Sequence, residues 1–335
     1  MNRIKIFLIS IGLFVFPLFI VAQKKYEFSH QQMGTQIGLI FYASGNIDNA
    51  QTIAKSVFQR IDDLNATLSN YIEHSELNHL GKNTDVPVDV SQDLFQILKL
   101  SDIYSKKTNG AFDVTLGPLI NLWKAVLKQG RIPTGQEITS TLKRTGYRNI
   151  EFPAVRSVIL RKTGMQLDLG GIGKGFAADE AIKVLRENGI NTALVDMGGD
   201  ITVSGPPPNK EFWTLGFSYF NEKGEEVFNK VKLRDQAIAT SGDQYQYTLI
   251  DGKRYSHIID PKSGRALSNR IQVTTIAPNG AMADAYASAL SVLGIKEGEK
   301  IVKETADLEV FIVEDVPGQY KSWSTPGFSD HIVAD

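Results

Sequence analysis

The sequence predicts an α+β fold, with helices flanking mixed and antiparallel sheets. Several segments place apolar residues at helical spacing, and many others are short and extended. Asp251-Gly252, between two extended segments, is a strong signal for a two-residue β-hairpin. Strands and helices do not alternate regularly along the sequence, which argues against a series of βαβ units.

Helices are expected where apolar residues recur every three or four positions. The clearest runs from Ala50 to Leu64, and its apolar face is interpreted as core packing. Ser91 suits the start of a second helix and Asn109-Gly110 its end. Further helices are expected at 118–126, 134–144, 176–188 and 281–293.

Extended segments make up most of the remaining chain. Residues 26–42 are expected to be extended, with an interruption at Met33-Gly34-Thr35. Shorter strands are expected at 155–160, 165–169, 190–195, 201–204, 213–219, 227–233, 245–250, 254–259 and 271–277, with a closing strand at 308–313. Pro206-Pro207-Pro208 is a candidate boundary between two lobes.

The first 22 residues have the layout of a secretory signal peptide. Arg3 and Lys5 precede an apolar run that starts at Ile6 and ends at Ala22, after which we expect cleavage. The alternative is an uncleaved membrane anchor, but the run is short and Pro17 interrupts it. No later segment is long and apolar enough to span a membrane, so we expect a soluble, exported protein.

Composition excludes several classes of function. Lys+Arg 36 against Asp+Glu 37 gives a net charge of −1, which argues against a basic nucleic-acid-binding surface. The chain has no cysteine, so a disulfide framework, a thiolate zinc site and a thiol nucleophile are excluded. A lipid-modified N-terminal cysteine is excluded for the same reason.

A glycine run, residues 168–175 (DLGGIGKG), directly precedes an expected helix. Such a turn lets a ligand approach the backbone, and helix N-terminal N–H groups favour a phosphate. The spacing does not match a P-loop, because Asp168 stands where the first glycine is needed. It does match the dinucleotide fingerprint G-x-G-x-x-A from Gly173 to Ala178. Two further interpretations therefore stay open: a dinucleotide-binding site, and a tight turn that binds no ligand.

Asp284 and Ser288 lie four residues apart on an alanine-rich helix and so share one face. A carboxylate and a hydroxyl are hard oxygen ligands that suit Mg²⁺. The alternative is an acid near a helix start that the helix dipole stabilises.

His257 lies at the end of an extended segment, beside the turn Asp260-Pro261. A histidine in this position can carry a proton, although a structural histidine has the same pattern. The sequence contains no G-x-S-x-G motif, which argues against a serine hydrolase.

Taken together, these motifs resemble the ApbE family of FAD:protein FMN transferases. The resemblance spans nearly the whole chain after residue 22, in order. Its motifs are Met33-Gly34-Thr35; Leu68-Ser69-Asn70-Tyr71 with Ser75-Glu76-Leu77-Asn78; residues 110–115 with Gly117-Pro118-Leu119; 168–175; Asp196-Met197-Gly198-Gly199-Asp200; Ala239-Thr240-Ser241-Gly242; residues 257–261; and Ala283-Asp284-Ala285.

The resemblance implies a single domain, residues 23–335, of two lobes with FAD in the cleft between them. It implies transfer of FMN from FAD to a Thr or Ser hydroxyl of an exported or membrane flavoprotein, with release of AMP. The location would be the periplasm or the outer face of the inner membrane. Many family members are lipoproteins, and this cysteine-free chain should not be one.

The resemblance also assigns residues. The FAD site would be lined by Met33, Tyr71, Ala111, Phe112, Asp113, Asp168, Lys174 and Ile259. Mg²⁺ would be held by the carbonyls of Gly171 and Ala287 and by the side chains of Asp284 and Ser288. The family often has Thr where this chain has Ser288, and commonly Ala where it has Gly173.

These assignments lead to a hypothesis for the mechanism. Mg²⁺ and Lys174 would neutralise charge on the pyrophosphate, and His257 would accept the proton of the incoming hydroxyl, with Asp260 orienting it. Three alternatives stay open: a Mg²⁺-dependent FAD pyrophosphatase, an exported flavin-binding protein without activity and a nicotinamide oxidoreductase.

Overall fold

The computed structural model describes residues 23–44, 46–242, 247–316 and 319–333. The expected signal peptide, residues 1–22, lies outside this part of the chain. Within the described residues, no helix has the length and apolar character needed to cross a bilayer.

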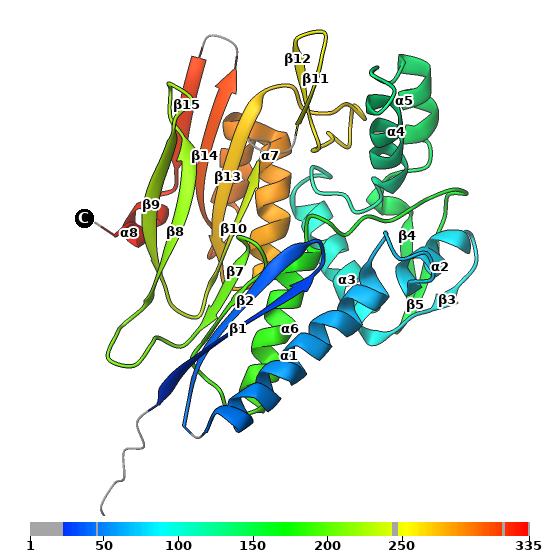
Figure 1. The fold of residues 1–335 in the computed structure, drawn as a ribbon. Coiled ribbons are helices and arrows are strands. Elements are labelled where there is room, and N and C mark those ends of the chain that lie inside the picture. The colour runs from blue at the N-terminus through cyan, green and yellow to red at the C-terminus, as the bar shows by residue number, and fades with distance from the viewer. Residues whose placement is uncertain (1–22, 45, 243–246, 317–318, 334–335) are drawn as a thin grey trace, which may run out of the picture.

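A large antiparallel sheet forms the centre of the fold (Figure 1). Its eight strands, in spatial order, are β1 (Lys24–Gln32), β2 (Thr35–Ala43), β6 (Ala193–Asp196), β7 (Ile201–Ser204), β10 (Ala237–Gly242), β13 (Arg270–Ala277), β14 (Glu309–Val316) and β15 (Gln319–Ser324). The turn at Met33-Gly34 makes the first extended segment a hairpin, in which Gln32 pairs with Thr35.

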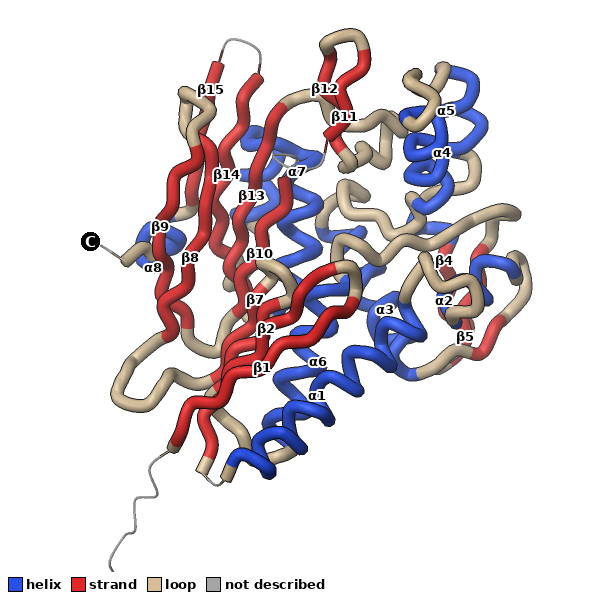
Figure 2. The backbone as a smooth tube through the Cα atoms, in the orientation of Figure 1, coloured by secondary structure: helices blue, strands red, loops and turns tan. Residues whose placement is uncertain are grey.

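Helices α1 (Ile47–Leu68), α6 (Gly173–Glu187) and α7 (Gly280–Lys303) lie along one face of this sheet, and α3 (Gln92–Lys107) packs beside them (Figure 2). The predicted apolar face of α1 is confirmed, because Ile53, Val57, Ile61 and Leu64 are buried. Together with the facing side chains of the sheet, these helices form the largest hydrophobic core.

The opposite face of the sheet is covered by the hairpin of β8 (Trp213–Phe220) and β9 (Glu226–Leu233), with helix α8 (Pro326–His331). Phe217, Phe311 and Phe328 pack there with ring centroids 5.6–6.1 Å apart. The Pro206–Pro208 loop connects β7 of the large sheet to β8.

Smaller elements complete the fold on the side away from the β8–β9 hairpin, on the right and at the top of Figure 1. They are α2 (Glu76–Lys82), the three-stranded sheet of β3 (Val88–Asp89), β5 (Ser157–Leu160) and β4 (Ile150–Ala154), helices α4 (Gly117–Leu127) and α5 (Gly135–Leu142), the 3-10 turn Tyr147–Asn149, and the hairpin of β11 (Tyr247–Ile250) and β12 (Lys253–Ser256). A third apolar cluster, which includes Trp123 and Ile259, joins α4 to the chain after β12.

The predicted α+β class is confirmed, and two local predictions are wrong. Residues 165–169 form no strand. Their side chains alternate between buried and exposed, as in a strand, but their backbone makes only isolated hydrogen bonds, such as Asp168 N–H to the Val114 carbonyl oxygen at 2.8 Å, and does not pair with a neighbouring strand. The closing strand at 308–313 is also not the last element, since β15 and α8 follow it and pack on the sheet.

Candidate functional site

The N-terminal turns of α6 and α7 meet at a close backbone contact. A Cβ atom placed on Gly280 would lie 2.5 Å from the carbonyl oxygen of Gly175 and 2.7 Å from Thr202 Oγ1, so both positions need glycine. The carboxylate of Asp179 on α6 accepts the backbone N–H groups of Gly280 (2.6 Å) and Ala281 (2.9 Å). Asp179 thus fixes the first turn of α7 to α6.

Asp284 lies one turn into α7 and is buried. Its Oδ2 accepts the backbone N–H of Gly175 at 3.2 Å. Burial, together with the negative charge of Asp200, raises the pKa of Asp284 to about 8, while Lys174 opposes the rise. A carboxylate placed this way costs free energy unless a cation compensates its charge.

Lys174, in the first turn of α6, forms an ion pair with the buried carboxylate of Asp200. Burial alone would lower the pKa of Lys174, but the charges of Asp200 and Asp284 raise it. Asp200 also accepts a backbone hydrogen bond from Thr240, and burial raises its pKa. The ammonium group of Lys174 therefore partly compensates the charges of two buried carboxylates, those of Asp200 and Asp284.

The glycine turn packs against the face of α7 that carries Asp284. A Cβ atom on Gly171 would lie 2.7 Å from Ser288 Oγ and 3.5 Å from the ring of Phe112. The structure therefore brings together Gly171, Asp284 and Ser288, three of the four residues predicted to hold a metal; the fourth, Ala287, precedes Ser288 on the same helix.

The donor set at this place is one carboxylate, one hydroxyl and backbone carbonyls, which are hard oxygen ligands of the kind that Mg²⁺ prefers. The described residues contain no group of three or more His, Cys, Asp or Glu side chains arranged for a metal. A cation here would therefore depend on hydroxyl and carbonyl oxygens as well as on Asp284, and the residues present fit that requirement.

Asp168 connects the glycine turn to the loop that carries Tyr71. Its Oδ2 accepts from Asn70 Nδ2 at 2.6 Å, and its Oδ1 accepts from the backbone of Gly170 at 2.9 Å. Tyr71 itself is 81% exposed, and its hydroxyl accepts a hydrogen bond from Lys124 Nζ at 3.0 Å.

Of the predicted flavin residues 111–113, Ala111 and Phe112 are buried and Asp113 is partly buried. The Asp113 carboxylate accepts the backbone N–H and hydroxyl of Thr115 (2.8 and 2.7 Å) and the backbone N–H of Tyr147 (3.0 Å). These three bonds hold the loop in place, and Phe112 presents its ring to the glycine turn. Met33 is partly buried at the tip of the β1–β2 hairpin, with φ of 51°.

His257 and Ile259 line a cavity of about 340 Å³ between α4 and the β11–β12 hairpin, together with Lys124. Both carboxylate oxygens of Asp260 accept hydrogen bonds inside their own turn, from the Lys262 N–H at 2.9 Å and the Ser263 hydroxyl at 2.6 Å. Asp260 therefore stabilises the turn after His257. Of the predicted residues, Gly171 and Ser288 lie together on the face of α7 that carries Asp284, whereas His257 and Ile259 line this cavity.

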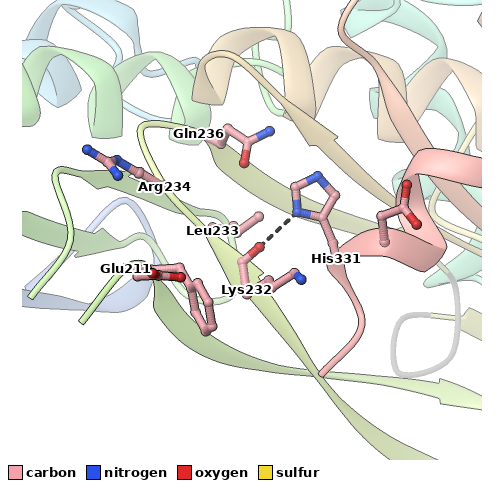
Figure 3. Close-up of a pocket in the computed structure, with 8 residues that line it drawn as sticks. Glu211, Lys232, Leu233, Arg234, Gln236 and His331 are labelled. Atoms are coloured by element: carbon pink, nitrogen blue, oxygen red, sulfur yellow. Dashed lines mark hydrogen bonds between the residues drawn. The ribbon is translucent and has the colours of Figure 1, made fainter. Parts of the chain in front are cut away.

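A second cavity, of about 520 Å³, lies between β9 and α8 (Figure 3). Its lining includes Lys232, Arg234 and His331, and His331 Nδ1 lies 2.8 Å from the Lys232 carbonyl oxygen. None of the predicted site residues lines it.

Asp179, Asp200 and Asn70 are site residues to which the sequence assigned no role. Asp200 and Asn70 stand inside the quoted motifs, so the motifs could have indicated them. Asp179 stands outside those motifs, and its contact with α7 bridges 101 residues of sequence, so only the fold reveals it.

Comparisons with a family model and with known proteins point to the same family. The model of the ApbE family matches residues 33–312. The FAD:protein FMN transferase of Escherichia coli is 30% identical over 290 residues, covering 84% of this chain and 82% of the relative. The enzyme of the same name from Vibrio cholerae is 30% identical over 302 residues, covering 88% and 89%.

Solved structures agree with this result. The flavin transferase ApbE from Vibrio cholerae superposes with a TM-score of 0.83 at 27% identity, covering 92% of this chain and 99% of that one. An ApbE protein from Thermotoga maritima gives 0.82 at 29% identity, covering 93% and 100%. With the family match spanning most of its length, this chain belongs to the ApbE family.

Proposed function

We propose that this protein transfers FMN from FAD to a Thr or Ser hydroxyl of a target protein and releases AMP. The observation that carries the proposal is the group formed by the buried Asp284 and the partly buried Lys174 and Ser288 against the glycine turn. The names of the relatives, FAD:protein FMN transferase, support it.

The FAD site would be formed by the predicted set: Met33, Tyr71, Ala111, Phe112, Asp113, Asp168, Lys174 and Ile259. The exposed ring of Tyr71 offers a surface for stacking. The N–H groups at the start of α6, with the Lys174 ammonium, are suited to the pyrophosphate.

Mg²⁺ would be held by Asp284, Ser288 and the carbonyls of Gly171 and Ala287, and it would neutralise charge on the phosphates. In the transfer, the acceptor oxygen forms a bond to the FMN phosphorus, and the bond from that phosphorus to the bridging oxygen breaks. AMP leaves with the bridging oxygen and the electron pair of that bond. His257 is the candidate for taking the proton from the acceptor hydroxyl.

The predicted signal peptide supports an exported or membrane-bound acceptor. The direct test incubates the purified protein with FAD, Mg²⁺ and a candidate exported flavoprotein, and then measures the mass of the acceptor. Covalent addition of FMN together with AMP release supports transfer. Release of AMP and free FMN, with an unmodified acceptor, would instead identify a pyrophosphatase.

A further inference from the structure

Helices α6 and α7 each provide a carboxylate to the first turn of the other. Asp179, in the second turn of α6, accepts the backbone N–H groups of Gly280 and Ala281 at 2.6 and 2.9 Å. Asp284, one turn into α7, accepts the backbone N–H of Gly175 at 3.2 Å. Because the start of a helix favours negative charge, this exchange of carboxylates fixes the two helices to each other.

All four N–H groups that begin α7 are paired within the protein. The first four N–H groups of an α-helix have no partner in the helix itself and need other acceptors. In α7, Asp179 accepts the first two. The side chain of Asn279 accepts the N–H of Met282 at 2.9 Å, and its carbonyl oxygen accepts that of Ala283 at 3.1 Å. Asp179 therefore completes the cap of α7 from a neighbouring helix.

The two carboxylates differ in how well their charge is compensated. Asp179 accepts two backbone N–H groups and the Thr202 hydroxyl, the latter at 3.4 Å. Removal from water raises the pKa of Asp179 to about 6, and these hydrogen bonds oppose the rise. Asp284 accepts one N–H group, and burial raises its pKa to about 8. Asp179 is thus suited to a structural role, while the charge of Asp284 calls for a cation.

The placement of Asp284 depends on where α7 begins. Asp284 lies four residues after Gly280, so a displacement of the first turn also displaces the Asp284 carboxylate. The contact between Gly280 and Gly175 is already close, so the two helix starts can separate but cannot approach further. We propose that Asp179 is a positioning residue: by holding the first turn of α7, it sets the affinity of Asp284 for a divalent cation without contacting the cation. This inference rests on the metal site of the proposed function and deepens it.

Two substitutions at Asp179 separate its geometry from its charge. Asp179→Asn removes the charge and leaves one oxygen for two N–H donors, whereas Asp179→Glu keeps the charge but displaces the carboxylate by one methylene group. Both should lower the Mg²⁺ affinity about tenfold, measured by calorimetry at pH 8 with protein and Mg²⁺ alone. A loss only in Asp179→Asn would mean that Asp179 acts through its charge, and unchanged affinity in both variants would mean that it does not position Asp284. Either result overturns the proposal.

Glu180→Gln is the matched control at the next position of α6. Glu180 forms its ion pair with Arg60 on α1, at 2.5 Å, and the substitution removes the same charge as Asp179→Asn. Because this pair shares no partner with the cap of α7, the Mg²⁺ affinity should stay within about twofold of that of the unaltered protein. Urea denaturation of each variant compares the losses of stability. An equal loss of Mg²⁺ affinity in Glu180→Gln and Asp179→Asn would reflect general destabilisation and overturn the proposal.

Hydrogen exchange tests the same coupling in the unaltered protein and so does not depend on whether a variant folds. Coupling between two sites is reciprocal: if the cap raises the cation affinity, the bound cation stabilises the cap by the same factor. Saturating Mg²⁺ should therefore slow exchange of the Gly280 and Ala281 amides about tenfold, with little change in the amides of α5. Unchanged exchange at Gly280 and Ala281, with Mg²⁺ bound by calorimetry, overturns this inference alone. A protein that binds no Mg²⁺ contradicts the metal site of the proposed function and this inference with it.

Discussion

Gly175 and Gly280 are in direct backbone contact, although they lie 105 positions apart in the sequence. A Cβ atom on Gly280 would lie 2.5 Å from the carbonyl oxygen of Gly175. Because the two helix starts approach so closely, the N–H of Gly175 reaches Asp284, and Lys174 lies near both Asp284 and Asp200. The contact therefore assembles the candidate metal site.

Gly175→Ala should separate the two helices. The new methyl group would collide with the backbone of Gly280 and Ala281, which cannot move aside as a flexible side chain can. We expect the free energy of unfolding to fall by about 1–3 kcal/mol, measured by urea denaturation, and Mg²⁺ affinity to fall with it.

Gly173→Ala is the matched control in the same turn. The nearest atom to a Cβ atom there is Leu169 Cβ at 3.9 Å, an ordinary contact. Alanine should be neutral or stabilise the start of α6 by up to about 1 kcal/mol. Equal losses in both variants would show that the turn needs glycine for flexibility and not for the contact with Gly280.

Asp284→Asn should remove metal-dependent AMP release and stabilise the metal-free protein at alkaline pH. The folded-state pKa of about 8 lies above the ordinary value of 3.8, so the folded protein holds a proton that the unfolded chain loses. In the metal-free protein this group's contribution to stability is present at low pH and is lost as pH rises from about 4 to about 8. Because asparagine carries no charge, the variant should not lose stability over this pH range through residue 284.

The measurement is the difference in unfolding free energy between Asp284→Asn and the unaltered protein, both with EDTA, at several pH values. The difference should grow in favour of the variant up to about pH 8, by roughly 1.4 kcal/mol for each unit of pKa shift that the surrounding groups leave uncompensated. A difference independent of pH would mean that Asp284 is already ionised and compensated in the folded protein.

Mg²⁺ affinity should itself depend on pH. Since a bound cation requires the Asp284 carboxylate, binding below a pKa of about 8 must release its proton. Lys174, Asp200 and Asp179 also influence this carboxylate. Calorimetry should show affinity increasing about tenfold per pH unit between pH 6 and 7.5, and levelling above 8. A constant affinity over this range would place the metal away from Asp284.

The sequence predicted much of this fold because local patterns determine it. The apolar spacing of α1 and the Asp251-Gly252 hairpin signal reflect local chemistry, and both features are present. The buried run at 165–169 looked like a strand because burial produces the same alternation without a neighbouring strand. Asp179 could not be assigned from its neighbours, since its partners belong to α7.

The sequence also predicted only part of the candidate site, because some of its contacts join segments that are far apart in the chain. The turn with Gly171 and the helix with Asp284 and Ser288 each had a local signal, and the fold brings them together. The pairing of Lys174 with Asp200 joins separate motifs, so it appears only in three dimensions.

His257→Gln should slow transfer while leaving FAD bound. His257 lines the cavity between α4 and the β11–β12 hairpin and is our candidate for accepting the proton, so its loss should reduce kcat by about 100-fold or more and change the affinity for FAD little. The acid limb of the pH–rate profile should disappear, because glutamine does not titrate. His74→Gln, at an exposed histidine outside the cavity, is the control and should transfer FMN at the unaltered rate. If His257→Gln keeps both the rate and the acid limb, another group accepts the proton; if it instead weakens FAD binding in proportion to the lost rate, His257 holds the nucleotide and not the acceptor hydroxyl.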